Sequence, residues 1–125
     1  MRFRSKNIIV MIKEKDEIKI QVVENSGNIA GRIAKHHILT PEEMGGRALM
    51  FARIDLPAGS MIKDHDHTED AEAYYILEGE LTATDNEKTQ VLHPGDVLFT
   101  ADGDRHSIEN RTDKPGAFLA VIFKN

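Results

Sequence analysis

HDHTEDAE, residues 65–72, places two histidines and four acidic residues within eight positions. In a β-strand, side chains two residues apart point to the same face, so His65 and His67 would stand side by side. Asp64 and Asp66 would then face the other way. Two imidazoles at this spacing can bind one metal ion, but the pair alone is equally compatible with two exposed histidines on a polar loop.

The acidic residues that follow the pair are expected to separate into two groups. Glu72 lies five residues beyond the second histidine, which leaves room for a tight turn and a return to the same interior from a neighbouring strand. Glu69 and Asp70 fall within that turn, where solvent is the expected environment. If a proton donor were needed, one of these two could approach the site from the turn.

A second segment, GDVLFTADGDRHSIEN at 95–110, raises the odds of a metal site. It predicts a strand, a glycine-containing turn and a second strand that carries one histidine. In that second strand His106 shares a face with Ile108. The segment therefore predicts a third imidazole in the interior.

The rest of the chain favours an all-β domain. Turn signals recur throughout, and the runs between them are short and rich in β-branched or aromatic residues, which is typical of a sandwich or barrel. One local exception is TPEEM at 40–44, where a capping box predicts a single helical turn that two glycines end. The predicted strand segments are ALMFARIDL (48–56), AYYIL (73–77), ELTATD (80–85), DVLFT (96–100) and AFLAVIF (117–123).

Several of these strands are apolar on both faces, which predicts that something covers each face. ALMFARIDL and AFLAVIF show this pattern, and NIIVMIK at 7–13 has the same character. Such strands imply either a second sheet of the same subunit or a partner subunit. We favour a homodimer that covers an outer sheet face, since two-fold homodimers are the commonest oligomers.

Composition narrows the class of protein. The 125 residues suit one domain, and a net charge of −5 with no basic face argues against a nucleic-acid partner. The absence of cysteine excludes disulfides, thiolate metal sites and thiol nucleophiles. No apolar run reaches the length of a membrane-spanning helix, and no signal-peptide pattern is present, so the expected location is the cytoplasm.

Taken together, the two histidine-bearing segments resemble the paired motifs of the cupin superfamily. The first motif, G-x5-H-x-H-x4-E-x6-G, is matched without a gap, and the second, G-x5-P-x-G-x2-H-x3-N, is matched except that Ala101 replaces its proline. The missing proline puts the stiffness of that turn in doubt, not metal binding. The matching residues are Gly59, His65, His67, Glu72, Gly79, Gly95, Gly103, His106 and Asn110.

The resemblance implies a single cupin domain over residues 1–125, with the two motifs within 59–110. Its fold would be a double-sheet jelly-roll barrel with a metal inside, and the positions carried over as ligands are His65, His67, Glu72 and His106. Three imidazoles and one carboxylate suit a divalent transition metal. Manganese is favoured, while iron, nickel, cobalt and zinc stay open.

The resemblance also implies a function. An octahedral ion with four protein ligands leaves two positions for a small oxygen-rich substrate, as in oxalate decarboxylase-like proteins, dioxygenases, isomerases or lyases. We therefore expect a metalloenzyme acting on a small carboxylate or sugar-like compound. The alternative is a cupin that binds or senses a small ligand without catalysis, and no catalytic residue can be assigned.

Two further residues are candidates for substrate binding. Arg53 interrupts an apolar strand, so it either reaches solvent at the rim or points inward to hold a carboxylate. Tyr74 shares a face with Glu72 and either lines the pocket or fills it. For Asn110, hydrogen bonding to backbone at the strand end is the expected role. The remaining histidines, His36, His37 and His93, are expected at the surface or in satisfied positions rather than as ligands.

Overall fold

The computed structural model describes residues 11–24, 32–66, 70–85, 87–101 and 105–124. Within these ranges the chain forms one 3-10 turn, η1 (Lys15–Glu17), followed by ten strands. The strands are β1 (Lys19–Glu24), β2 (Arg32–Leu39), β3 (Ala48–Leu56), β4 (Met61–Asp66), β5 (Asp70–Glu78), β6 (Leu81–Asp85), β7 (Lys88–Leu92), β8 (Val97–Thr100), β9 (Arg105–Glu109) and β10 (Gly116–Lys124).

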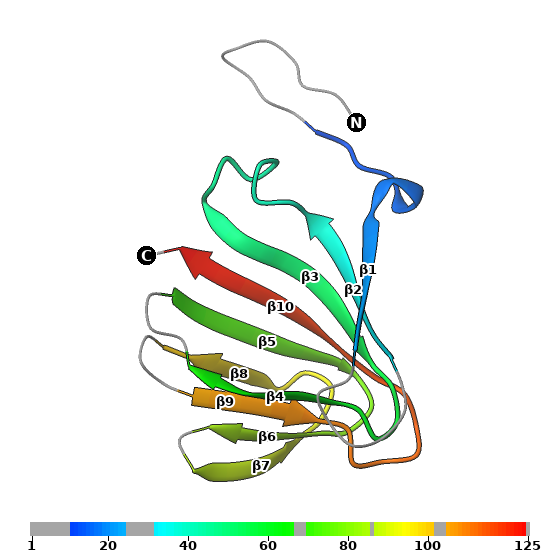
Figure 1. The fold of residues 1–125 in the computed structure, drawn as a ribbon, viewed down its shortest axis with the longest axis vertical. Helices are drawn as coiled ribbons and strands as arrows, with labels where there is room; N and C mark the ends of the chain where they lie inside the picture. The colour runs from blue at the N-terminus through cyan, green and yellow to red at the C-terminus, as the bar shows by residue number, and fades with distance from the viewer. Residues whose placement is uncertain (1–10, 25–31, 67–69, 86, 102–104, 125) are drawn as a thin grey trace.

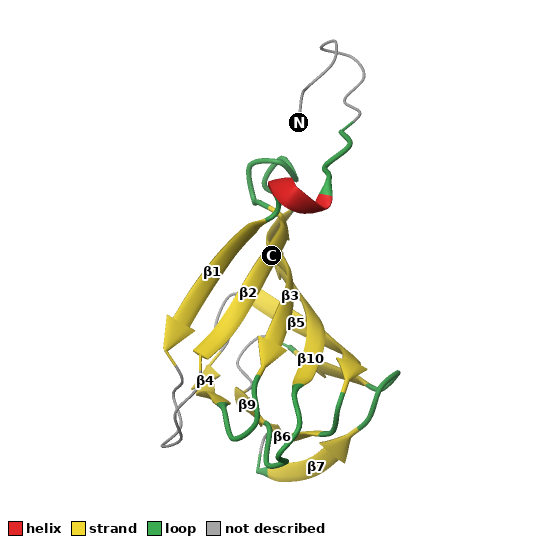
Figure 2. Cartoon of the chain, turned by 90° about the vertical axis from the view of Figure 1, so that its right-hand side faces the viewer, coloured by secondary structure: helices red, strands yellow, loops and turns green. Residues whose placement is uncertain are grey.

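The strands form two antiparallel sheets that face each other (Figures 1 and 2). The larger sheet has the order β1-β2-β3-β10-β5-β8, and the smaller has the order β4-β9-β6-β7. Strands that are neighbours in the larger sheet, such as β3 and β10, come from distant parts of the sequence. This is the double-sheet jelly-roll architecture that the sequence predicts.

The core between the sheets follows the predicted alternation of side chains. On β3, Ala52, Ile54 and Leu56 are buried, while the residues between them are only partly buried. The inward residues of β3, β5, β6, β9 and β10 meet in one cluster around Phe118. Burying a large apolar side chain completely contributes roughly 1.5–3 kcal/mol, so this cluster is the main source of stability.

The helical turn expected at residues 40–44 is confirmed. The Glu43 amide donates to Thr40 Oγ1 at 3.2 Å, and the Thr40 amide donates to Glu43 Oε1 at 2.9 Å, which completes the capping box. Gly45 and Gly46 follow with φ of 65° and 73°, a conformation that ends the turn. The same Glu43 carboxylate binds Lys13 Nζ at 2.8 Å and so attaches the segment before β1 to this turn.

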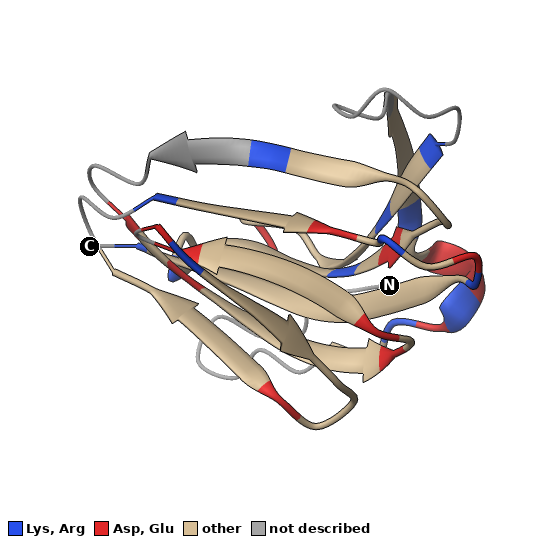
Figure 3. Cartoon of the chain, turned by 90° about the horizontal axis from the view of Figure 1, so that it is seen from below, with Lys and Arg blue, Asp and Glu red and all other residues tan. Residues whose placement is uncertain are grey.

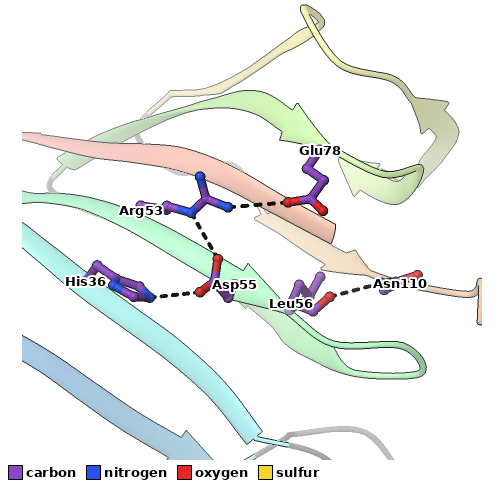
Figure 4. A network of polar contacts seen from close by, with 6 residues as sticks. All are labelled: His36, Arg53, Asp55, Leu56, Glu78 and Asn110. Carbon is purple, nitrogen blue, oxygen red and sulfur yellow. Dashed lines mark hydrogen bonds and ion pairs between the residues drawn. The ribbon is translucent and has the colours of Figure 1, made fainter. Parts of the chain in front are cut away.

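Asn110 ties together the loops at one end of the barrel. Its side-chain amide donates to the carbonyls of Leu56, at 2.9 Å, and Lys114, at 2.7 Å, and its Oδ1 accepts from the Thr112 amide at 3.0 Å. Figure 4 shows the contact with Leu56. The expected role of Asn110 in backbone hydrogen bonding is therefore confirmed.

The structure describes the first segment, NIIVMIK, only in part. Of NIIVMIK, residues 7–10 lie outside the described residues, and residues 11–13 are not in a strand. Within the described part, Ile12 is exposed, so its apolar side chain is not part of the core of the subunit. In the part of the chain that the structure describes, no helix is both long and apolar enough to cross a membrane.

Candidate metal centre

The two sheets bring a histidine and a carboxylate together inside the barrel. His106 lies on β9 in the smaller sheet and Glu72 on β5 in the larger one, and their side chains are only 1% and 4% exposed. His106 Nε2 lies 3.0 Å from Glu72 Oε1. Because neither group reaches bulk water, solvent screens any charge on them only weakly.

Two hydroxyl groups from the larger sheet also contact the imidazole. Tyr74 Oη lies 3.0 Å from His106 Nε2, and Thr100 Oγ1 lies 2.7 Å from His106 Nδ1. Glu72 and Thr100 are direct partners in the β5–β8 ladder, so one row of that ladder supplies contacts to both ring nitrogens. The phenol ring of Tyr74 packs edge-on against the imidazole, with centroids 5.1 Å apart.

Tyr74 keeps its proton in this environment. Burial raises the pKa of Tyr74 well above its ordinary value, and the charge of Glu72 and a hydrogen bond to it act in the same direction. The phenol is therefore a hydrogen-bond donor rather than an acid at neutral pH. Its ring also packs on Phe118, with centroids 4.4 Å apart, so it both fills the core and contacts the site.

The other two expected ligands are only partly covered by the structure. The backbone of His65 pairs directly with that of His106 in the β4–β9 ladder, so the two residues occupy facing positions. His67, like Glu69, lies outside the described residues. Among the described residues, His, Cys, Asp and Glu form no group of three or more that could hold a metal ion. The role of the four-residue set stays a prediction.

The spacing of the two donors that are described fits a metal ion. Ligand bonds of about 2.1 Å at a right angle would place a nitrogen and an oxygen about 3 Å apart. His106 Nε2 and Glu72 Oε1 have this separation. A carboxylate and an imidazole, without sulfur, also form a donor set that divalent transition metals accept.

Arg53 is not brought to this cluster. It alternates on β3 with buried Ala52 and Ile54, so its side chain lies on the outer face of the larger sheet. There Arg53 Nε donates to Asp55 at 3.0 Å, and one terminal nitrogen donates to Glu78 at 3.4 Å (Figure 4). Of the two orientations expected for Arg53, the structure therefore shows the one outside the interior. Arg53 does not point inward, where it would hold a substrate.

The remaining histidines have the surface or satisfied positions that the sequence predicts. His36 Nε2 contacts Asp55 at 2.8 Å on the outer face of the larger sheet (Figure 4), and His37 Nε2 contacts Gln21 at 2.9 Å. His93 is exposed, and its amide donates to Asp96 in the turn before β8. Thr100 is the residue that sequence reasoning missed. The only signal for it was a polar side chain at the inward end of an otherwise apolar strand.

Comparison with known proteins decides the family. The sequence profile of the cupin domain matches residues 52–122, more than half of the chain. The chain belongs to the cupin family. This cupin is 40% identical over 112 residues to the oxalate-binding protein of Thermotoga maritima, a match that covers 90% of this chain and 93% of that one. A second relative, the tetracenomycin polyketide synthase protein TcmJ of Streptomyces glaucescens, is 32% identical over 68% of this chain and 57% of its own.

Solved structures agree with this assignment. A crystal structure from Thermotoga maritima, described as a predicted oxalate decarboxylase, superimposes with a TM-score of 0.83 and 39% identity, over 92% of this cupin and all of that chain. A cupin from Silicibacter pomeroyi, described as a sugar phosphate isomerase, has a TM-score of 0.71 and 24% identity over 90% of this chain and 74% of its own. At that identity the likeness shows the fold alone.

Proposed function

We propose that this cupin binds a small carboxylate, oxalate or a close analogue, through a divalent metal held by His65, His67, Glu72 and His106. The single observation that carries the proposal is the 3.0 Å approach of two buried donors, His106 Nε2 and Glu72 Oε1, from opposite sheets. The facing backbone positions of His65 and His106 support a shared site. The name of the 40% identical relative, an oxalate-binding protein, supports the class of ligand.

The metal that fits this set is a transition metal of intermediate hardness. Manganese is our first choice, and iron, nickel, cobalt and zinc accept the same donors. Once bound, such an ion acts as a Lewis acid that attracts and polarises carboxylate oxygens. Its positive charge would also offset the cost of burying the Glu72 carboxylate.

Tyr74 is the residue that we propose as the ligand's hydrogen-bond donor. Its hydroxyl lies 3.0 Å from the nitrogen that would bind the metal, so it is close to any oxygen on the ion. The raised pKa keeps the hydroxyl protonated and able to donate.

A second candidate is a metalloenzyme acting on the same class of ligand. The observation in its favour is the structural match, at 39% identity, to a protein described as a predicted oxalate decarboxylase. Decarboxylation needs a proton for the carbon that keeps the electron pair of the broken bond. Of the two candidates from the sequence, Glu69 lies outside the described residues, and Asp70 lies at the start of β5. The enzyme hypothesis therefore depends on finding turnover.

Oxalate binding is expected to require the metal. We expect the purified cupin to carry, or to take up, one divalent metal per chain, and oxalate to bind the manganese-loaded protein. After chelation the same titration should show at least a tenfold loss of oxalate affinity. Elemental analysis followed by calorimetric titration tests this. Acetate, which cannot chelate through two carboxylates, is the matched control ligand.

The outcomes distinguish the two candidates. Equal oxalate affinity with and without metal would contradict a metal-dependent site. Formation of formate and carbon dioxide from oxalate in the loaded protein would select the enzyme. Tight metal-dependent binding without product over hours would select the binding protein.

We also propose that the outer face of the larger sheet is covered by a second copy of the chain. Successive strand partners form one row across the face, in which apolar residues surround Arg53 and His36. Val97 and Phe99 on β8 are 61% and 57% exposed. The row is Val97, Tyr75, Leu119, Arg53, His36 and Ile20.

Size and charge both suit a two-fold interface. Six strands at about 4.8 Å spacing give a face about 24 Å wide, comparable with the side of about 28 Å of a square patch of roughly 800 Å², the area that each partner of a stable complex buries. Figure 3 shows long stretches of strand without charged residues. Charged side chains on this face contact one another, because Arg53 pairs with Asp55 and Glu78 (Figure 4).

Val97→Glu is expected to dissociate this dimer. A carboxylate within an apolar interface loses its hydration, so we expect the dimer dissociation constant to rise at least tenfold. Val91→Glu is the matched control, since Val91 is 43% exposed on β7 in the other sheet. Analytical ultracentrifugation measures both. A monomeric wild-type protein, or a Val97→Glu variant that dimerises as well as Val91→Glu, would contradict the proposal.

A further inference from the structure

Thr100 has a position that links the two halves of the candidate site. It is the last residue of β8, is only 1% exposed, and faces Glu72 directly in the β5–β8 ladder. Its Oγ1 lies 2.7 Å from His106 Nδ1. Thr100 therefore reaches from the larger sheet to a residue of the smaller one, β9, which Figure 1 shows in the other layer.

The imidazole of His106 is held at both nitrogens by these contacts. Thr100 contacts Nδ1, while Tyr74 and Glu72 contact Nε2. The edge-on ring of Tyr74, inclined at 67° to the imidazole, restricts rotation of the His106 side chain. In this arrangement the imidazole presents Nε2 to the Glu72 carboxylate.

A metal ligand has to offer a lone pair, so the proton of a neutral imidazole must sit on the other nitrogen. If Nε2 binds the ion, the proton is on Nδ1 and needs an acceptor. A threonine hydroxyl can accept that hydrogen bond, and it lies at the required distance. Such partners behind a metal-binding histidine fix its tautomer and orientation.

We propose that Thr100 is a positioning residue for the metal centre: its hydroxyl accepts the Nδ1 proton of His106 and holds the Nε2 lone pair towards Glu72. The inference rests on the proposed function, because it assigns the residue behind one of the proposed ligands. Thr100 touches neither metal nor substrate and acts only through His106.

The test replaces the hydroxyl without changing the shape of the side chain. Thr100→Val removes the hydroxyl, Thr100→Ser keeps it, and Thr82→Val makes the same change at another buried threonine, on β6. Affinity for Mn²⁺ and Zn²⁺ is measured by competition with a chelator. We expect Thr100→Val to bind each metal about 10–100-fold more weakly, which is the range for lost partners of metal ligands. Thr100→Ser and Thr82→Val should stay within about threefold of wild type.

A spectroscopic measurement separates positioning from a general loss of packing. Nitrogen-15 NMR of the His106 ring reports which nitrogen carries the proton. In the zinc-loaded wild type and Thr100→Ser we expect Nδ1 protonated and Nε2 bound. In metal-free Thr100→Val we expect a mixture of tautomers, with a larger share protonated at Nε2 than in metal-free wild type. If Thr100→Val does not fold, Thr100→Ser is compared with Thr100→Ala. Both variants lack the methyl group of threonine, so they differ only in the hydroxyl.

Three results would overturn the inference. Wild-type affinity in Thr100→Val would show that the hydroxyl does not matter. Equal weakening in Thr100→Ser and Thr100→Val would assign the effect to packing. A wild-type protein that takes up neither metal would overturn the proposed function, and the inference with it, whereas the first two results leave the proposed function intact.

Discussion

Replacing His106 by alanine is expected to lower metal affinity by more than about 100-fold, which exceeds the usual effect of losing a partner behind a ligand. The change removes the nitrogen that lies 3.0 Å from Glu72 Oε1, so only one of the two described donors stays. The sheets should persist, because the apolar cluster around Phe118 does not depend on the imidazole. Metal content per chain after dialysis, with circular dichroism to verify the fold, measures the effect.

Two variants make this measurement specific. His93→Ala removes an exposed histidine and should leave metal content unchanged. Glu72→Gln keeps the shape of the side chain but removes its charge, and should weaken metal binding through the second donor. Unchanged metal content in a folded His106→Ala variant would remove His106 from the proposed ligand set.

Substituting Gly79 by alanine is expected to cause the largest loss of stability among the changes considered. Gly79 joins β5 to β6 with φ of 79°, a region that costs other residues about 1–2 kcal/mol. A Cβ atom there would also lie 2.6 Å from the carbonyl oxygen of Pro115, which is backbone and cannot rotate away. Forcing the strands apart adds about 1–3 kcal/mol, as overpacking does in a core.

Gly46→Ala is the matched control for this prediction. Gly46 has a similar φ of 73°, but nothing lies within 4 Å of the position that a Cβ atom would take there. It should therefore show only the backbone cost. Urea denaturation of both variants measures the difference in unfolding free energy. Equal losses in Gly79→Ala and Gly46→Ala would refute a steric role for the Pro115 carbonyl.

Most of the fold could be predicted from the sequence, because strand alternation and turn chemistry are local properties. The segment 48–56 corresponds to β3 residue for residue, and the capping box at Thr40 and Glu43 forms as the spacing indicates. Residues 11–13 are harder, since their apolar composition does not show that they lie outside any strand. The hairpin of β1 and β2 lacks a strong alternating pattern, and the sequence does not predict it.

The candidate site was predictable to the extent that spacing along the chain determines it. The motif spacing selects His106 and Glu72, and the structure brings these two together. Orientation depends on neighbouring strands, which explains why Arg53 lies on the outer face and why Thr100 was missed. Thr100 contacts His106 only because β8 pairs with β5 at Glu72, and that register cannot be read from either strand alone.

The placement of Glu72 and His106 in different sheets has a mechanical consequence. An ion bound by both would act as a cross-link between the two layers, joining positions that are 34 residues apart in the chain. Because the unfolded chain does not hold the donors together, binding would count directly towards the free energy of unfolding. At a free metal concentration of 100 times Kd the gain is about 2.7 kcal/mol. The stability of this cupin barrel would then depend directly on the free metal concentration.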